Sequence, residues 1–406
     1  MKKNTGGLRV IMMLGLCGAF AIFSSTISKS PILPIFANSL GATGAQIGWI
    51  ASASTVPGIL ISYLAGDLAD RFGYKKILIG SLLIFASAPF LYLLVINPIG
   101  LAGVRFYHGF ATAAFDPVAM AAIAAFNRKN TGQNLSLYTS ATLVGRALAP
   151  TVGGSAYEYG GTVTVYGIAG ATGILALAFA LWFFHKSKNM HDAEEAAQSV
   201  KQEAEKIPFL KKLWGLLLYR PLLLVGLLNA CAYFSYSAFE MIIPLYAKQL
   251  GMSTGEIGFV LGAQMVGMIL LKPLFGRASD RHGRLPLMVA GLLVCSVIFF
   301  LLTVVKSTLI VVPLIVAYGL GFALITSGTN ALAADVAQKG QLGASLGVMS
   351  TLMDVGQTFG PPAIGALSDR YSYTAGIGML GAILMAAAAG CVFALVKQRH
   401  TPSPDA

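Results

Sequence analysis

The chain is 406 residues long, with 56% hydrophobic and only 11% charged side chains and a mean hydropathy of +0.73. A soluble globular domain carries about 25% charged residues, so this composition excludes a soluble protein. The net charge of +12 does not indicate nucleic-acid binding, because most lysines and arginines fall on one side of the predicted membrane helices. Lys248, Lys306 and Arg370 are the exceptions on the other side, and such a bias is typical of cytoplasmic loops.

Segments of about 20 mostly apolar residues, the length needed to cross a bilayer, recur along the chain. In chain order, twelve of them begin near residues 9, 46, 77, 99, 135, 164, 218, 256, 285, 309, 344 and 374. The sequence lacks the ten-residue stretches of alternating apolar and polar residues that mark membrane β-barrels. The prediction is an all-α membrane protein with twelve transmembrane helices in two six-helix bundles.

The first apolar segment follows Met1, Lys2 and Lys3, which also fits a secretory signal peptide. An internal repeat makes it the first helix of a bundle instead. The basic loops then place both termini in the cytoplasm of a multi-pass inner-membrane protein. Neither the four cysteines nor the five histidines follow a disulfide or metal-ligand pattern, and no paired nucleophile and base points to an enzyme.

The sequence repeats itself at an offset of 210 residues. Residues matched in this way are Pro34 and Pro244, Ala37 and Ala247, Leu40 and Leu250, Gly41 and Gly251, Ile47 and Ile257, and Gly48 and Gly258. We therefore predict two six-helix bundles over 1–185 and 216–406, related as a parallel duplication, as in many secondary transporters. The polar segment 186–215 joins them as a cytoplasmic linker, either an amphipathic surface helix or a disordered tether, and a short tail ends the chain.

Two short loops in register carry the same motif. The first contains Gly66, Asp70, Arg71 and Gly73, and the second contains Gly276, Asp280, Arg281 and Gly283. Both resemble the signature loop of the major facilitator superfamily, a resemblance that covers essentially the whole chain. Glycine permits a tight turn, and Asp and Arg can join helix ends through charged hydrogen bonds. By resemblance, these loops gate the change between outward-open and inward-open states.

The fourth segment carries Arg105, His108, Thr112 and Asp116 at helical spacing, so they form one polar stripe. Arg105 and His108 stand where the superfamily has its second motif. At 1.5 Å of rise per residue, Arg105 and Asp116 are too far apart to pair directly. Each is expected to have another partner, and Arg105 either contacts substrate or holds neighbouring helices together.

The fifth segment carries Gly145, Pro150, Gly153 and Gly154, and resembles the antiporter motif of the twelve-helix drug:H+ antiporter family, with Ala149 in place of a glycine. Small residues allow helices to approach closely and proline bends a helix. The resemblance implies packing against the other half and a limit on proton leak. Segment 11 echoes the motif from Gly356 to Gly365. Arg146 is expected as a buried cation that contacts substrate or a carboxylate, or as a structural residue.

Further charges at membrane depth are Lys29, Glu240 and Asp354. A carboxylate in this environment takes up a proton more readily than in water, so Asp116, Glu240 and Asp354 are the proton-coupling candidates. Tyr233, Tyr236 and Glu240 share a helical face, which suits an amphipathic cation. A cluster of interfacial tyrosines with a snorkelling acid is the alternative. The predicted substrate-binding residues are Lys29, Arg105, His108, Arg146, Tyr233 and Tyr236.

The resulting hypothesis is a secondary active transporter that exports a drug-like small molecule against protons by alternating access. The proton gradient drives it, no cofactor or metal is needed, and the bilayer and the substrate are its only partners, with a monomer implied by resemblance. The three cations Lys29, Arg105 and Arg146 leave an alternative open, which is transport of an anionic metabolite, siderophore or lipid. Proton-coupled uptake is also open.

Overall fold

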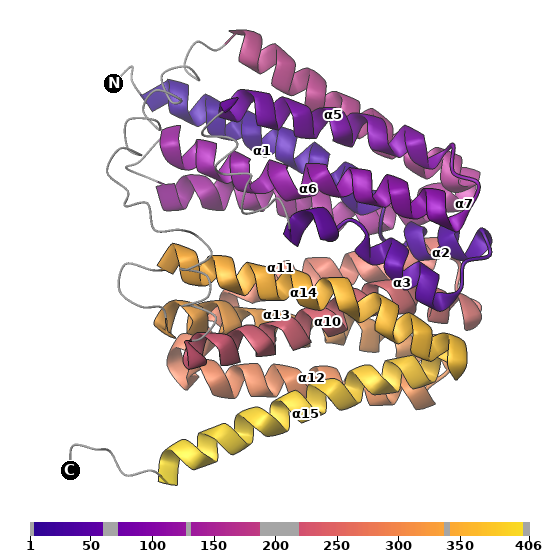
Figure 1. Cartoon of the computed structure of the whole chain (residues 1–406), viewed down its shortest axis with the longest axis vertical. Coiled ribbons are helices and arrows are strands. Elements are labelled where there is room, and N and C mark those ends of the chain that lie inside the picture. Colours follow the sequence, from indigo (N-terminus) through magenta and orange to yellow (C-terminus); the bar gives the residue numbers. More distant parts are fainter. Residues whose placement is uncertain (1–3, 60–71, 127–130, 187–218, 337–341, 401–406) are drawn as a thin grey trace. The chain divides into compact units, whose positions relative to one another are not determined.

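The computed structural model describes residues 4–59, 72–126, 131–186, 219–336 and 342–400. Every regular element in these ranges is a helix, which confirms the all-α prediction. The helices, with their bounds, are α1 (Asn4–Ile27), α2 (Ile32–Ser39), α3 (Gly44–Ser52), α5 (Tyr74–Tyr92), α6 (Pro98–Phe126), α7 (Thr131–Lys186), α10 (Arg220–Gln249), α11 (Thr254–His282), α12 (Arg284–Val304), α13 (Thr308–Val336), α14 (Leu342–Arg370) and α15 (Tyr373–His400) (Figure 1).

The long helix α7 contains two of the predicted membrane segments. Its backbone leaves helical geometry at Gly160 (φ −155°, ψ 22°) and at Gly161 (φ 62°, ψ −153°), the second of which is a conformation that only glycine adopts readily. The predicted starts of segments 5 and 6, near residues 135 and 164, lie on either side of this break. The break therefore separates the two membrane segments that α7 joins.

Residues far apart in sequence form two compact units. Unit 1 contains Met1–Ala42, Trp49–Ile207 and Ser253–Gly262, and unit 2 contains Thr43–Gly48, Pro208–Met252 and Ala263–Ala406. The first turns of α11 thus belong to unit 1, although the rest of that helix belongs to unit 2. The first residues of α3 belong to unit 2 in the same way. The predicted linker 186–215 and the terminal tail fall outside the described residues, apart from Lys186.

Helix packing repeats itself in the two units. In unit 1, α1 packs along α7, and α5 packs on both α6 and α7. In unit 2, α10 packs along α14, and α12 packs on both α13 and α15. These are the pairs expected when one six-helix plan is used twice, and they agree with the repeat in the sequence.

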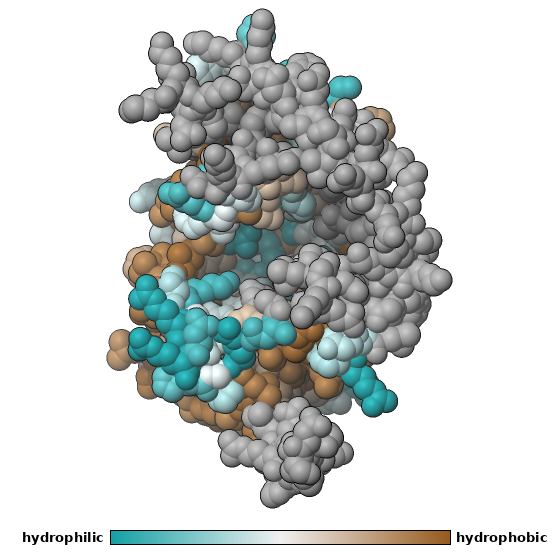
Figure 2. Space-filling model, turned by 90° about the vertical axis from the view of Figure 1, so that its left-hand side faces the viewer, coloured by the Kyte–Doolittle hydropathy of each residue, from teal (hydrophilic) through white to brown (hydrophobic). Residues whose placement is uncertain are grey.

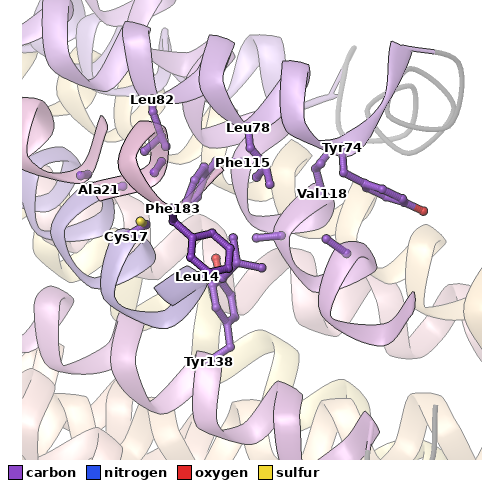
Figure 3. Packing of buried hydrophobic residues seen from close by; sticks show 14 of the residues in the cluster. Leu14, Cys17, Ala21, Tyr74, Leu78, Leu82, Phe115, Val118, Tyr138 and Phe183 are labelled. Atoms are coloured by element: carbon purple, nitrogen blue, oxygen red, sulfur yellow. The ribbon is translucent and has the colours of Figure 1, made fainter. Parts of the chain in front are cut away.

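The core of unit 1 is an apolar cluster in which α1, α5, α6 and α7 meet. Leu14 and Cys17 of α1, Leu82 of α5, Phe115 of α6 and Phe183 of α7 all belong to it, and Figure 3 shows these side chains turned toward one another. Tyr138 is the one member of the labelled group that brings a polar atom between α1 and α6. The phenolic oxygen therefore needs a hydrogen-bond acceptor there.

The outer surface is apolar to a degree that only a membrane explains. Large side chains such as Ile96, Ile99 and Leu309 are 84–85% exposed, whereas teal hydrophilic residues gather on the face shown in Figure 2. Among the described helices, eight are long and apolar enough to cross a bilayer. One of them, α7, contains two membrane segments separated by the break at Gly160 and Gly161. Lipid, not water, covers the sides of this chain.

The last glycine of each signature loop has the same backbone conformation. Gly73 precedes α5 with φ 90° and ψ 142°, and Gly283 precedes α12 with φ 92° and ψ 149°. Side chains other than glycine are essentially excluded from this region. The repeat in the sequence is thus also a repeat in backbone conformation.

Candidate functional site

One end of the polar stripe on α6, at Asp116, is a hydrogen-bonded pair. The Tyr138 hydroxyl of α7 donates to Oδ1 of Asp116 over 2.6 Å, while the Tyr138 side chain is only 2% exposed. Gly18 of α1 leaves room for the tyrosine ring, since a Cβ at that position would lie 2.9 Å from Cε2 of the ring. Asp116 is half-buried, so its carboxylate is held in one orientation by a neighbour that cannot move away.

The other end of the stripe lies inside unit 1. Arg105 is 2% exposed and donates from Nη2 to the Ser54 hydroxyl over 2.5 Å. His108 is 1% exposed, and its Nδ1 lies 3.3 Å from the Tyr92 hydroxyl. Tyr92 in turn stacks on Tyr166 with ring centroids 4.6 Å apart. Enclosure in a polar cluster favours the structural interpretation of Arg105 and His108 over substrate contact. Thr112 bonds the Gly109 carbonyl of its own helix.

Of the other two predicted cations, Arg146 is not buried as expected, and Lys29 lies in a turn inside a candidate membrane span. Arg146 is exposed, not buried, because its neighbour Gly145 forms the face of α7 that packs on α1 and the next residue is rotated by about 100°. It still lies within electrostatic range of Tyr138. Lys29 is half-buried in the turn between α1, which ends at Ile27, and α2, not within the first helix.

Unit 2 contains a group of aromatic rings beside a carboxylate. Tyr236 of α10 stacks on Phe322 of α13 with centroids 4.3 Å apart and an interplanar angle of 18°. Tyr233 meets the same Phe322 edge-on at 5.2 Å. Glu240, one turn beyond Tyr236, is half-buried and lies within electrostatic range of the buried Tyr318. Tyr233, Tyr236, Phe322 and Glu240, here called the aromatic–acid group, all belong to unit 2.

Asp354 on α14 is the third candidate acid. Its side chain is half-buried, and its backbone carbonyl accepts a hydrogen bond from the Thr358 hydroxyl over 2.7 Å. The glycines that follow it, Gly356 and Gly360, lie against the carbonyls of Ala230 and Phe234 on α10. Asp354 therefore lies in unit 2 beside a close contact between α10 and α14.

The antiporter-like motif lies on two faces of α7. A Cβ on Gly145 would overlap the Ala19 carbonyl of α1, and one on Gly153 would lie 2.9 Å from the Ile27 side chain. On the other face, Gly154 lies against Gly258 in the first turns of α11. Gly258 also lies against the Pro150 carbonyl. The motif thus packs α7 between α1 and a segment from the second half of the sequence, all within unit 1.

The second signature loop is described in full. Arg284, which follows Gly283, forms an ion pair with Asp280 and another with Asp335 at the end of α13, with Nε to Oδ2 at 2.9 Å. Of the residues predicted for this loop, Gly276, Asp280 and Arg281 lie in the last turns of α11, and only Gly283 lies between α11 and α12. In the first copy, Gly73 is described, whereas the predicted residues Gly66, Asp70 and Arg71 lie outside the described residues.

Sequence reasoning missed several partners. Tyr138, Phe322 and Asp335 come from helices other than the one that carries the predicted residue, so no spacing along the chain connects them. A signal existed for Tyr138, since it lies seven residues before Gly145 of the antiporter-like motif and therefore on the same side of the helix. Among the described residues, no cluster of three or more metal-ligating side chains occurs.

Comparison with known proteins identifies the family. The family model described as Major Facilitator Superfamily matches residues 14–255 and again residues 225–406. The quinolone resistance protein NorA of Staphylococcus aureus is 26% identical over 384 residues, which cover 94% of this chain and 95% of that protein. The multi-drug resistance efflux pump PmrA homolog of Lactococcus lactis is 26% identical over 370 residues, with 89% and 88% covered.

Solved structures agree on the fold. The crystal structure of a mutant of the nucleoside transporter NupG superposes with a TM-score of 0.80 at 14% identity, over 96% of this chain and 99% of that one. At this identity the likeness concerns the arrangement of helices alone.

Proposed function

Because the chain belongs to the Major Facilitator Superfamily and is a multi-pass membrane transporter, we propose that it exports amphipathic aromatic cations in exchange for protons. Transport proceeds by alternating access, in which the substrate site opens first to one side of the membrane and then to the other. The proposal takes the inner membrane as the location, with both termini in the cytoplasm, a monomer as the working unit, and the proton gradient as the driving force.

The aromatic–acid group is the observation that carries the proposal. The ring of Tyr236 is half-buried and stacks on the buried ring of Phe322. A tyrosine ring held in this way can attract a cation or stack with a planar ligand. Glu240 supplies a negative charge one helical turn away. An aromatic substrate with an ammonium group can therefore bind both the aromatic rings of α10 and α13 and the carboxylate of Glu240, whereas an anion would be repelled by that carboxylate.

Proton exchange needs an acidic side chain that releases its proton when the substrate binds. Glu240 fits this requirement directly, since a cation and a proton compete for the same carboxylate. Asp116 is a second candidate, because its carboxylate accepts a hydrogen bond from the Tyr138 hydroxyl of the neighbouring helix. Asp354 is the remaining candidate. We assign substrate competition to Glu240 and a second protonation step to Asp116.

The names of two relatives support the direction of transport. NorA is a quinolone resistance protein and the PmrA homolog is a multi-drug resistance efflux pump, and both align with nearly all of this chain. Multi-drug efflux, the activity named for the PmrA homolog, agrees with the export proposed here for the aromatic–acid group.

Flux of ethidium, a fluorescent aromatic cation, into proteoliposomes under an imposed pH gradient tests the proposal. Ethidium movement should depend on the gradient and release protons in return, and Glu240→Gln should lower it by at least tenfold. Glu256→Gln is the matched control, because Glu256 is a carboxylate outside the proposed site that accepts a hydrogen bond from the amide of Ser253, three residues before it. Transport of an anionic dye in place of ethidium would support the anion alternative, and transport independent of pH would exclude antiport.

A further inference from the structure

Two carboxylates bond the beginnings of helices that are distant in sequence. Glu158, two residues before the break in α7, accepts hydrogen bonds at Oε1 from the amides of Thr254 at 2.5 Å and Gly255 at 3.2 Å. These amides open α11. All three residues lie in unit 1, so a helix of the second sequence half begins on a carboxylate of the first.

Unit 2 contains the reciprocal contact. Asp369, near the end of α14, accepts at Oδ1 from the amide of Gly44 at 2.6 Å and at Oδ2 from the amide of Ala45 at 2.8 Å. These amides open α3. Here a helix of the first sequence half begins on a carboxylate of the second, and all three residues lie in unit 2.

The two contacts are related by the duplication. Pro150, Gly154 and Glu158 match Pro361, Gly365 and Asp369 at an offset of 211 residues. The helix starts match at 210, because Gly44 corresponds to Thr254. Below the carboxylates, Gly154 lies against Gly258 and Gly365 lies against Gly44, which lets the helices approach closely enough for the bonds to form.

Each helix start already has a local cap, and the distant carboxylate completes it. The Ser253 amide donates to Glu256 Oε2 and the Glu256 amide to Ser253 Oγ, at 2.8 and 3.1 Å. This is a capping box, which leaves the two intervening amides without partners from their own segment. Glu158 accepts from those two amides, and its charge also faces the positive end of the helix.

The other helix start is built alike. The Thr43 amide donates to Gln46 Oε1 and the Gln46 amide to Thr43 Oγ1, at 3.0 and 3.3 Å. The remaining amides, those of Gly44 and Ala45, go to Asp369. The local box uses a neutral glutamine at one site and a glutamate at the other, but the distant group is a carboxylate at both.

We propose that Glu158 and Asp369 form a pair of conformational latches that hold one side of the transporter closed. Each bond joins a helix of one repeat to a helix of the other, at the first residues of α11 or α3. Opening that side separates the repeats there, so both latches break together. The inference rests on the alternating access of the proposed function, but not on its substrate or on proton exchange.

Spin labels placed on α7 and α11 test the latch at Glu158. Tyr159 is 90% exposed and Phe259 is 65% exposed, so both accept a label in the full chain after its four cysteines are replaced by alanine. Distances between the labels are measured by double electron–electron resonance in lipid nanodiscs. Both carboxylates are exposed to solvent, so the interaction of each charge with a helix start is weak. We therefore expect Glu158→Gln to raise the population with the longer distance only about fivefold.

The controls separate a latch from an ordinary surface charge. Glu256→Gln removes the same charge from the same turn without touching the α7 contact, so the distance distribution should stay that of the parent. Asp369→Asn, whose carboxylate lies in the other unit, should shift the α7–α11 distance in the same direction as Glu158→Gln. Should Glu158→Gln fail to fold, Glu158→Asp shortens the side chain by one methylene and carries the same expectation.

Two negative results have different meanings. If ethidium and pH move the labels in the parent but Glu158→Gln leaves the distribution unchanged, the latch is refuted and alternating access stands. If the parent shows one distance under every condition while Glu158→Gln also changes nothing, alternating access fails together with the latch.

Discussion

The close approach of α1 and α7 gives a prediction whose size follows from the structure. A Cβ added to Gly145 would overlap the carbonyl oxygen of Ala19 and would lie 3.1 Å from its carbonyl carbon. These are backbone atoms, which cannot rotate out of the way, so the helices must separate. Overpacking of this kind costs about 1–3 kcal/mol, which exceeds the gain of about 0.5–1 kcal/mol from replacing a helical glycine by alanine.

Gly145→Ala should therefore destabilise the protein, and a control on the same helix isolates the reason. Gly167 of α7 would meet nothing within 4 Å of an added Cβ, so Gly167→Ala retains only the entropic gain. Thermal unfolding in detergent, followed by the loss of the monodisperse peak in size-exclusion chromatography, ranks the variants. We expect Gly145→Ala below wild type and Gly167→Ala at or above it. Equal stability of the two variants would refute the packing argument.

Three further predictions concern the site and the loops. Tyr138→Phe keeps the ring but removes the donor to Asp116, a bond to a charged group worth about 1.5–3 kcal/mol. The melting temperature should therefore fall, and ethidium flux per folded protein should fall about tenfold. Undiminished flux would exclude a role for this bond. Phe322→Leu removes the stacking partner of Tyr236, an interaction worth about 0.5–1.5 kcal/mol. The KM for ethidium should therefore rise several-fold. An unchanged KM would mean that the substrate binds elsewhere. Gly283→Ala forces alanine to φ 92°, a backbone strain that costs about 1–3 kcal/mol, and should lower the melting temperature. A variant as stable as wild type would show that the loop relaxes.

The repeat was visible in the sequence because the duplication preserved residues with strict backbone requirements. Gly73 and Gly283 match at the offset of 210 residues, and the structure gives both the same positive φ. The membrane class was equally plain, since an apolar chain of this length has no other solvent. Both inferences depend on local properties, which are the amount of apolar surface and the conformations open to one residue.

Partners across helices were beyond the sequence. The stripe on α6 predicted that Arg105 and Asp116 need separate partners, but not that these are Ser54 and Tyr138. Arg146 was expected to be buried, and it is exposed because Gly145 takes the packed face of the helix. A period of 3.6 residues gives the relative angle of side chains on one helix, but not which angle faces a neighbour.

The sequence by itself determined that this chain is a duplicated all-helical membrane protein, because hydropathy and glycine positions act on each segment alone. Only the tertiary structure decided which polar groups meet. Glu158 and Asp369 lie at sequence distances of 96 and 325 residues from the amides they bond, and no local preference encodes such a pairing. It follows from the packing of α7 on α11 and of α14 on α3, which brings each carboxylate to the two amides that the local cap of the helix start leaves without a partner.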